Sequence, residues 1–202
     1  KVLLDLCGQP VLEWATTRLK RSERLDEVVV ATSLRLEDDA IAAFCTTRGV
    51  PCFRGSEDDV LDRYYKAARA YQAEVIVRVT GDDPLIDPQV VDAVVAAFKS
   101  HQPGIAYASN VHPRRTYPRG QDTEVFGFDA LEKAWREDHD PRLREHVTQY
   151  MVRNAAQFPF WNLENETDYS FMRWALDTSS DLEFLRTVCA HIDDKASWTD
   201  IV

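Results

Sequence analysis

The sequence predicts an α/β fold in a single domain, residues 1–202, in which helices cover both faces of a mixed, mostly parallel sheet to give three layers. Apolar runs alternate with helical patterns through the first half of the chain, which is typical of parallel strands joined by helices. The apolar runs are continuous, so both faces of these strands are expected to be buried. No repeat, low-complexity tract or long linker divides the chain, which favours one domain over two.

The first half shows the clearest alternation. Pro10 and Pro88 suit the first turn of a helix, and Gly49 suits a helix end. Ser56 precedes several acidic residues and is expected to cap the helix that follows, because acidic side chains are favourable near a helix N-terminus. Strands are expected at 26–33, 50–55 and 74–80, and helices at 10–22, 36–49, 56–72 and 87–101.

The second half has a different character, with strands that suggest some antiparallel pairing in a mixed sheet. Strands are expected at 104–110, 123–129, 158–163 and 170–177, and helices at 129–138, 140–154 and 179–192.

Composition excludes several classes of partner. The formal charge of −10 and the pI of about 5.0 argue against a general affinity for nucleic acid or anionic membranes. No apolar run approaches the ~20 residues that span a bilayer, and no basic and apolar leader is present. We therefore expect a cytoplasmic protein without membrane insertion. The cysteines lack metal-finger spacing and are expected to be reduced thiols.

The stretch RVTGDDPLIDPQVV, residues 78–91, places carboxylates directly after an apolar run. Asp87 precedes Pro88 and suits a helix cap, and Asp83 suits a turn. Asp82 is different, since adjacent carboxylates at a strand end repel each other unless a cation lies nearby. Ligands of open α/β sheets bind outside the carboxyl ends of the strands. The pattern therefore predicts a functional role for Asp82.

A second strand-end carboxylate occurs in RWALDTSSDLEFL, where Asp177 precedes the expected cap at Thr178 or Ser179. Asp181 is explained by helix capping, but Asp177 is not. If the two segments lie close together, Asp82 and Asp177 converge on one hard cation. Magnesium suits such a sparse site, because Mg²⁺ typically takes one or two carboxylates together with water and substrate phosphate oxygens.

At these residues the chain resembles the cytidylyltransferases of the CMP-KDO synthetase superfamily, and especially the spore-coat polysaccharide synthesis protein F group. The resemblance covers essentially the whole chain and rests on seven motifs in order, which are KVLLDLCGQPVLEW, VVVATS, FRGSEDDVLDRYYKAA, RVTGDDPLIDP, YPRGQDTEVF, REHVTQYM and LDTSSDLEFLR. It implies a nucleotide-diphospho-sugar transferase fold and transfer of a nucleotide to a sugar acid with release of pyrophosphate.

The resemblance also implies roles for particular residues. Asp82 and Asp177 match the family's magnesium-binding aspartates, and Lys1 matches the lysine that closes its N-terminal triphosphate loop. These three are the expected catalytic residues. The loop itself is not in the sequence, so the domain 1–202 is expected to lack its N-terminal strand and triphosphate loop.

The nucleotide site is expected to include further polar residues. Arg78 matches a position beside the base or ribose, and its burial in an apolar strand without a partner would be costly. Arg63 matches an arginine near the nucleotide, with a helix-surface role as the alternative. Thr32 and Ser33 either line the nucleotide pocket or cap the next helix. The expected nucleotide-binding set is Lys1, Thr32, Ser33, Arg63, Arg78 and Asp82.

Mixed charges in YPRGQDTEVF and REHVTQY are candidates for binding a carboxylated sugar, because arginine binds carboxylates bidentately. For His146 the alternative is a packed or capping histidine. The expected substrate-binding residues are Arg119, Asp122, Glu124, Arg144, Glu145 and His146.

The expected reaction is attack of a sugar hydroxyl on the α-phosphorus of CTP, with Mg²⁺ as cofactor. Two alternatives stay open: a related transferase that uses another base or a nucleotide sugar, and a catalytically silent nucleotide-binding domain. The aromatic segment 158–174 suits a subunit contact in a homodimer, and it suits the core equally well.

Overall fold

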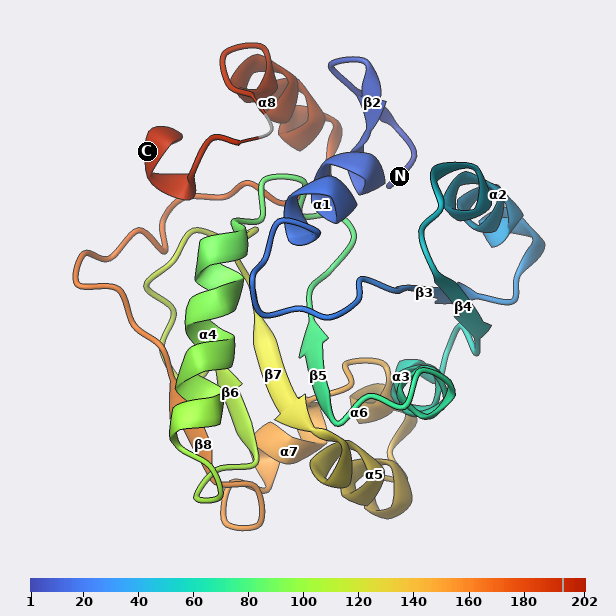
Figure 1. The fold of residues 1–202 in the computed structure, drawn as a ribbon, viewed down its shortest axis with the longest axis vertical. Coiled ribbons are helices and arrows are strands. Elements are labelled where there is room, and N and C mark those ends of the chain that lie inside the picture. The colour runs from blue at the N-terminus through green and yellow to red at the C-terminus, as the bar shows by residue number, and fades with distance from the viewer. Residues whose placement is uncertain (194) are drawn as a thin grey trace.

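The computed structural model describes residues 1–193 and 195–202. Figure 1 shows the order of the elements along the chain. The strands are β1 (Asp5–Leu6), β2 (Gln9–Pro10), β3 (Val30–Ser33), β4 (Cys52–Gly55), β5 (Val75–Arg78), β6 (Tyr107–Ser109), β7 (Glu124–Gly127) and β8 (Phe160–Asn162). The helices are α1 (Val11–Leu19), α2 (Asp39–Arg48), α3 (Val60–Ala70), α4 (Pro88–Ser100), α5 (Phe128–Glu137), α6 (Pro141–Arg144), α7 (Gln149–Arg153) and α8 (Ser179–Cys189), with 3₁₀ turns η1 (Leu36–Asp38) and η2 (Trp198–Asp200).

The central sheet has four strands in the order β5-β7-β6-β8. Strand β7 runs antiparallel to both of its neighbours, and β6 and β8 are parallel. Three of the four strands therefore point the same way, and only β7 opposes them. Strands β3 and β4 form a separate parallel pair. These arrangements confirm the predicted α/β fold with a mixed, mostly parallel sheet.

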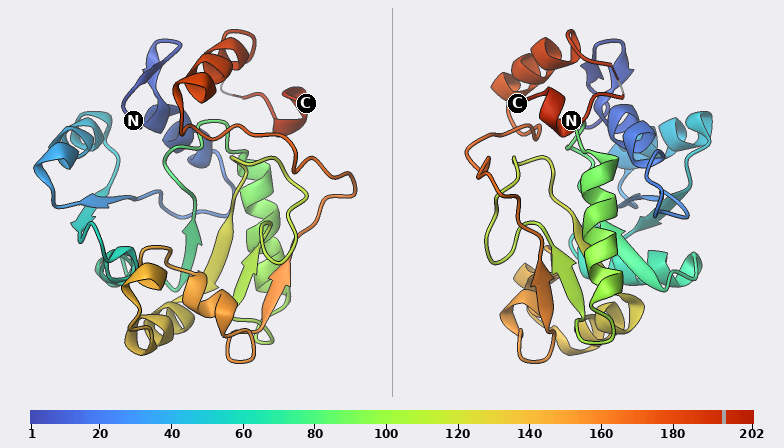
Figure 2. Two further views of the ribbon diagram at one scale, coloured as in Figure 1. Left: turned by 180° about the vertical axis from the view of Figure 1, so that it is seen from behind. Right: turned by 60° about the vertical axis from the view of Figure 1, so that its left-hand side comes forward.

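Helices cover both faces of this sheet (Figures 1 and 2). On one face, α4 packs Val91, Val94, Val95 and Phe98 against Ala108 and Val125. On the other face, α3, α5 and α7 pack against Ile76 and Phe126. The split follows from strand geometry, since neighbouring side chains of a strand point to opposite faces. The same alternation places Arg78 on the same face of the sheet as Ile76.

A third core cluster lies above the carboxyl end of β5 and joins the two ends of the chain. Leu6 and Trp14 from the N-terminal part pack with Leu85, Trp174 and Leu185. The Trp14 indole N–H also donates to the Leu6 carbonyl at 2.8 Å. This cluster fixes the start of the chain and the start of α8 beside the loop that follows β5.

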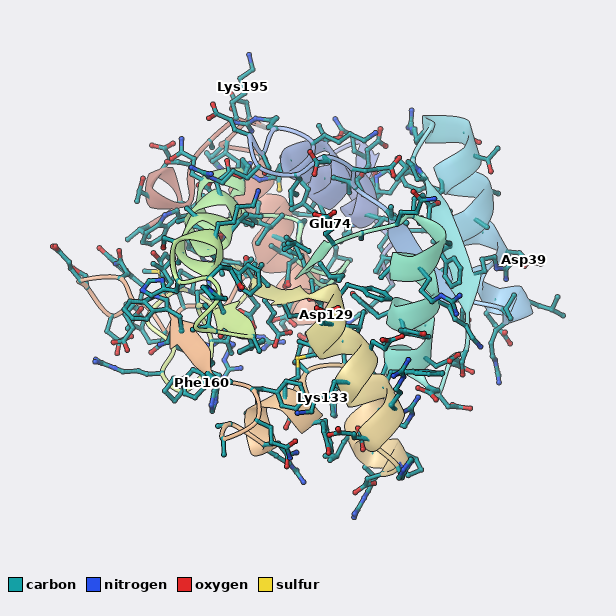
Figure 3. All side chains as sticks on the ribbon, turned by 60° about the horizontal axis from the view of Figure 1, so that its bottom comes forward. Asp39, Glu74, Asp129, Lys133, Phe160 and Lys195 are labelled. Atoms are coloured by element: carbon teal, nitrogen blue, oxygen red, sulfur yellow. The ribbon has the colours of Figure 1, made fainter. Side chains whose placement is uncertain are left out.

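Figure 3 looks at the opposite end of the sheet, where Glu74, just before β5, lies near Asp129 in α5. The Phe128 N–H donates to the Glu74 carbonyl at 2.9 Å. A hollow of about 930 Å³ lies there and is bordered by Arg69, Lys99 and both carboxylates. None of the predicted site residues lines it.

Two predicted elements differ from the structure. Residues 170–177 form no strand, and only an isolated bridge joins Arg119 to Arg173. That segment is held between loops, because the Trp174 N–H donates to the Arg119 carbonyl at 2.7 Å and the Leu176 N–H to the Asp82 carbonyl at 2.9 Å. The predicted helix 140–154 is broken at Val147, which is fully buried and has a φ of +53°. Valine in this left-handed region interrupts a helix.

Two helix caps are those predicted from the sequence, and a third differs from the prediction. The Asp87 carboxylate accepts from the Gln89 N–H at 2.8 Å, and Thr178 forms a reciprocal capping box with Asp181. Ser56 is not the cap of α3. Asp59 is, and its carboxylate accepts from the Asp62 N–H at 2.8 Å, while the Ser56 hydroxyl accepts from the Asp59 N–H.

A second hollow of about 590 Å³ separates β3 from β5. Its walls include Val29 and Ala31 on one side and Val75, Val77 and Val79 on the other. Within the described residues, β3 pairs only with β4, and β5 pairs only with β7. The strand edges that face this hollow are therefore unpaired.

None of the helices in the described part of the chain has the length and apolar character that crossing a membrane requires.

Candidate active site

The structure brings Lys1, Asp82 and Asp177 together at the carboxyl end of β5. The Lys1 ammonium lies 2.6 Å from Asp82 Oδ2 and 2.8 Å from Asp177 Oδ1. The two carboxylates come from segments 95 residues apart, and the hydrogen bond from the Leu176 N–H to the Asp82 carbonyl holds their backbones side by side. Burial acts to lower the pKa of Lys1, but hydrogen bonds to Asp177 and Asp82 outweigh it and raise that pKa.

Asp177 is held on several sides. Lys1 contacts one carboxylate oxygen, and the Arg173 guanidinium donates to the other. These hydrogen bonds hold the pKa of Asp177 below its usual range. Arg173 also reaches Asp181 Oδ1 at 3.4 Å, and Asp181 accepts the Asp177 N–H at 2.9 Å. The orientation of Asp177 is thus set by its neighbours.

Arg173 was not among the residues predicted from the sequence. Its signal is its position four residues before Asp177, with a buried Trp174 and a buried Leu176 between them. Because side chains of an extended segment alternate, this spacing places Arg173 and Asp177 on the same side.

The donor set fits a hard divalent cation. Two carboxylates already converge on a single positive charge, the Lys1 ammonium, which acts as a stand-in cation. Carboxylate oxygens are the ligands that Mg²⁺ prefers. No cluster of three or more potential metal-binding His, Cys, Asp or Glu residues occurs in the described chain. A cation here would therefore take its other ligands from water and substrate.

The neighbouring Asp83 is buried and takes part in the turn, as expected. Its carboxylate accepts from the Thr80 hydroxyl at 2.5 Å, and its carbonyl accepts from the Ile86 N–H at 3.3 Å. Burial raises the pKa of Asp83 to about 7. Asp82 and Asp83 thus differ in environment although they are adjacent in sequence.

Thr32 and Ser33 end β3, and Arg63 belongs to α3, where its side chain lies against Gly55 at the end of β4. The Thr32 hydroxyl donates to Asp38 at 2.7 Å, and the Ser33 N–H donates to the same oxygen at 2.9 Å. Arg63 donates to the Ser56 carbonyl at 2.6 Å, while its Nε is buried without a partner. Burial lowers the pKa of Arg63. Within the described residues, none of these three side chains is bonded to Asp82, so their role in nucleotide binding stays a prediction.

Arg78 and Glu124 form an ion pair across neighbouring strands. Glu124 also accepts from the Tyr107 hydroxyl at 2.7 Å and from the Thr148 hydroxyl at 2.6 Å. Burial acts to lower the pKa of Arg78, but Glu124 outweighs it and raises that pKa. The partner that the burial of Arg78 requires is therefore Glu124. This network accounts for both charges structurally, and their expected roles toward nucleotide and sugar remain predictions.

The other predicted substrate residues are dispersed. Asp122 is paired bidentately with Arg115, which the sequence analysis did not single out. Arg144 is held by Asp59 at 2.8 Å and by carbonyls at the end of α5. The side chains of Arg119, Glu145 and His146 are exposed. Of this set, Arg119 is the residue connected to the segment of Asp177, because its backbone forms an isolated β-bridge with Arg173.

The cap of α8 gives a testable pH dependence. The backbone N–H groups of Asp177 and Thr178 lower the pKa of Asp181 from 3.8 to about 2. A depressed folded pKa contributes stability that is present above about pH 4 and is lost as the pH falls through about 2. Replacing Asp181 by alanine should therefore lower the free energy of unfolding by about 1 kcal/mol at pH 7, and the difference from wild type should shrink below pH 4.

Urea unfolding at several pH values measures this difference. Glu183→Ala is the matched control, because Glu183 lies in the same helix and its carboxylate makes no cap contact. Equal losses for the two variants at pH 7, or a constant loss at every pH, would contradict the assignment.

The chain as a whole is similar to known cytidylyltransferases. The family model described as cytidylyltransferase matches residues 1–192. The chain is 31% identical over 195 residues to the spore coat polysaccharide biosynthesis protein SpsF of Bacillus subtilis, covering 93% of this chain and 79% of that protein. It superposes on a cytidylyltransferase from Leptospira borgpetersenii with a TM-score of 0.95 and 35% identity, covering 100% of this chain and 84% of the other.

A more distant structure shares the fold. It is CMP:2-keto-3-deoxy-manno-octonic acid synthetase complexed with CTP, with a TM-score of 0.70 and 20% identity, covering 94% of this chain and 91% of that one. The resemblance to the CMP-KDO synthetase superfamily and the predicted nucleotidyltransferase fold are thereby confirmed.

Proposed function

Since the chain belongs to the cytidylyltransferase family, we propose that it transfers CMP from CTP to a hydroxyl of an acidic sugar and releases pyrophosphate. The observation that carries this proposal is the convergence of Asp82 and Asp177 on one positive charge at the carboxyl end of β5. The name of the Bacillus relative, a polysaccharide biosynthesis protein, supports a place in the synthesis of surface polysaccharide or glycoconjugate.

Asp82 and Asp177 would hold Mg²⁺ in this reaction. When bound, such a cation supplies positive charge that stabilises charge developing on phosphate oxygens. Arg173 and Asp181 keep Asp177 oriented, so this carboxylate is held in position before substrate arrives. Lys1 supplies a further positive charge for the phosphates. Transfer to phosphorus depends mainly on such positioning and charge neutralisation.

An acidic acceptor fits the exposed Arg119, whose backbone bonds to the segment that leads to Asp177. Arg119 is exposed, and its side chain makes no hydrogen bond or ion pair to the rest of the described chain. A guanidinium binds a carboxylate in a bidentate way, so Arg119 would orient an acidic sugar toward Asp82 and Asp177. Glu145 and His146 are exposed and remain proposed partners for sugar hydroxyls.

The hollow between β3 and β5 supports one more expectation. An extended segment in this position would pair with two open strand edges and bury apolar side chains such as Val29 and Val77. A strand followed by a triphosphate loop, expected before Lys1, would suit the hollow. Protein with and without upstream residues should be compared in the test that follows.

A thermal-shift series tests the proposal. With Mg²⁺ present, CTP should raise the unfolding temperature more than UTP, ATP, GTP or dTTP, because a ligand at 100 times its dissociation constant stabilises the folded state by about 2.7 kcal/mol. Pyrophosphate release with CTP and acidic sugars should follow. If another nucleotide stabilises the protein selectively, that nucleotide replaces CTP as the proposed donor. Group transfer without release of pyrophosphate would indicate a glycosyltransferase. The absence of any nucleotide response in both forms would overturn the proposal.

A further inference from the structure

Lys1 occupies the place where the two carboxylates would hold a cation. Its ammonium contacts Asp82 Oδ2 at 2.6 Å and Asp177 Oδ1 at 2.8 Å. We propose that Lys1 is a placeholder: it neutralises the two carboxylates in the ligand-free protein, and the divalent cation binds them both only after the Lys1 side chain has left. This inference rests on the proposed function only in taking Asp82 and Asp177 as the cation ligands.

The two occupants exclude each other for a simple reason. Magnesium binds carboxylate oxygens at about 2.0–2.1 Å, and these are the oxygens that Lys1 contacts. A cation bridging them would fall next to the ammonium, and two positive charges at that separation repel each other strongly. Cation binding to both carboxylates and the Lys1 ion pairs are therefore alternatives.

The side chain of Lys1 is able to leave without disturbing the backbone. It is 43% exposed, so its ion pairs are of the solvent-accessible kind that individually contribute little. The backbone at this end is anchored separately, because the Leu4 N–H donates to the Lys1 carbonyl at 2.9 Å and the Leu12 N–H donates to the Val2 carbonyl at 2.8 Å. Rotation of the flexible four-carbon stem is enough to free the site.

The carboxylates stay in place when Lys1 leaves. Arg173 binds the other oxygen of Asp177, Oδ2, and does not compete for Oδ1. The Asp177 N–H remains bonded to Asp181, and the Asp82 carbonyl remains bonded to the Leu176 N–H. Lys1 alone thus changes partner, while the rest of the ionic cluster keeps its geometry.

The placeholder lowers the apparent affinity for the cation, because part of the binding free energy is used to displace it. Removing the ammonium should therefore tighten cation binding in the absence of nucleotide. If Lys1 served only to contact phosphates, its ammonium would lie away from Asp82 Oδ2 and Asp177 Oδ1, and removing it would change the affinity for the free cation little. The two roles predict different results for the cation alone.

Binding of Mn²⁺ without nucleotide, followed by electron paramagnetic resonance, tests the inference on the whole chain. Lys1→Met should bind Mn²⁺ about three- to tenfold more tightly than wild type, a range set by the loss of two exposed ion pairs. Lys66→Met is the matched control, because Lys66 is 59% exposed and pairs with Asp62 at 2.7 Å. The control removes the same charge away from the site and should leave the Mn²⁺ affinity unchanged.

A second variant assigns the gain to the correct site. Adding Asp82→Asn to Lys1→Met should abolish the extra Mn²⁺ affinity, because it removes one of the two ligands. An affinity of Lys1→Met equal to or weaker than wild type would overturn the inference, and so would an equal gain in Lys66→Met. If CTP fails to bind while the gain is observed, the placeholder stands and the proposed function fails. If CTP is used and Lys1→Met shows no gain in Mn²⁺ affinity, the proposed function stands and the placeholder role of Lys1 fails.

Discussion

Replacing Asp82 by asparagine is expected to abolish turnover, with a loss of about 1,000-fold or more in kcat/KM, because a bound cation contributes several kcal/mol of transition-state stabilisation. The fold should be preserved. The backbone carbonyl of Asp82 bonds to the Leu176 N–H, and asparagine keeps that bond. The side chain loses only its ion pair with Lys1, at a site where the carboxylate is 22% exposed.

Pyrophosphate release and thermal unfolding measure the two parts of this prediction. Asp39→Asn is the matched control, because Asp39 pairs with Arg54 at 2.7 Å on a different edge and is 56% exposed. Both variants should unfold close to the wild-type temperature, and only Asp82→Asn should lose activity. Pyrophosphate release by Asp82→Asn at the wild-type rate would eliminate Asp82 as a cation ligand.

The largest effect on stability is expected at Glu124. Changing Glu124 to glutamine leaves the Arg78 guanidinium with an uncompensated charge, because the side chains of Arg78 and Glu124 are only 22% and 12% exposed. Breaking a buried ion pair from one side typically costs about 3–5 kcal/mol. The hydrogen bonds from Tyr107 and Thr148 to Glu124 would weaken as well, since both end on a charged acceptor.

Urea denaturation measures this loss. Glu164→Gln is the control, because Glu164 pairs with Arg114 at 3.2 Å and both side chains are largely exposed, so the change should cost less than about 1 kcal/mol. A loss of similar size in both variants would show that the Arg78–Glu124 pair is no more important than a surface pair.

A double replacement separates the structural role of Arg78 from its expected role in nucleotide binding. Arg78→Met with Glu124→Leu should recover much of the stability lost by Glu124→Gln, since an apolar pair often replaces a buried ion pair at little cost. If Arg78 also contacts the nucleotide, the double variant should bind CTP more weakly than wild type. Wild-type CTP affinity in a stable double variant would assign Arg78 a purely structural role.

Local patterns allowed most elements to be predicted. Continuous apolar runs marked β3 and β5, and the caps at Asp87 and Thr178 marked the starts of α4 and α8. These features depend on residues close in sequence, so pattern and capping chemistry are enough to identify them. The position of Asp82 after an apolar run was visible for the same reason. The strand expected to end at Asp177 does not form, and the meeting of the two carboxylates was expected only on condition that their segments lie close together.

Other features depend on contacts that no local pattern contains. The sequence around Val147 has a helical pattern. In the structure Val147 is buried in the core with a left-handed backbone, and it divides α6 from α7. Residues 170–177 read as a strand, yet the loops at Arg119 and Asp82 take their backbone hydrogen bonds. Tertiary packing overrode local preference in both places.

The sequence by itself determined the fold class, the family and the presence of carboxylates at the ends of two extended segments, because these follow from periodicity and from motifs in order. Only the tertiary structure decided which charges meet. Strand β7 lies between β5 and β6, which sets Glu124 opposite Arg78. The cluster of Leu6, Trp14 and Leu185 brings the first residue to the start of α8, where Lys1 lies between Asp82 and Asp177. Partners this far apart in sequence are chosen by sheet order and core packing.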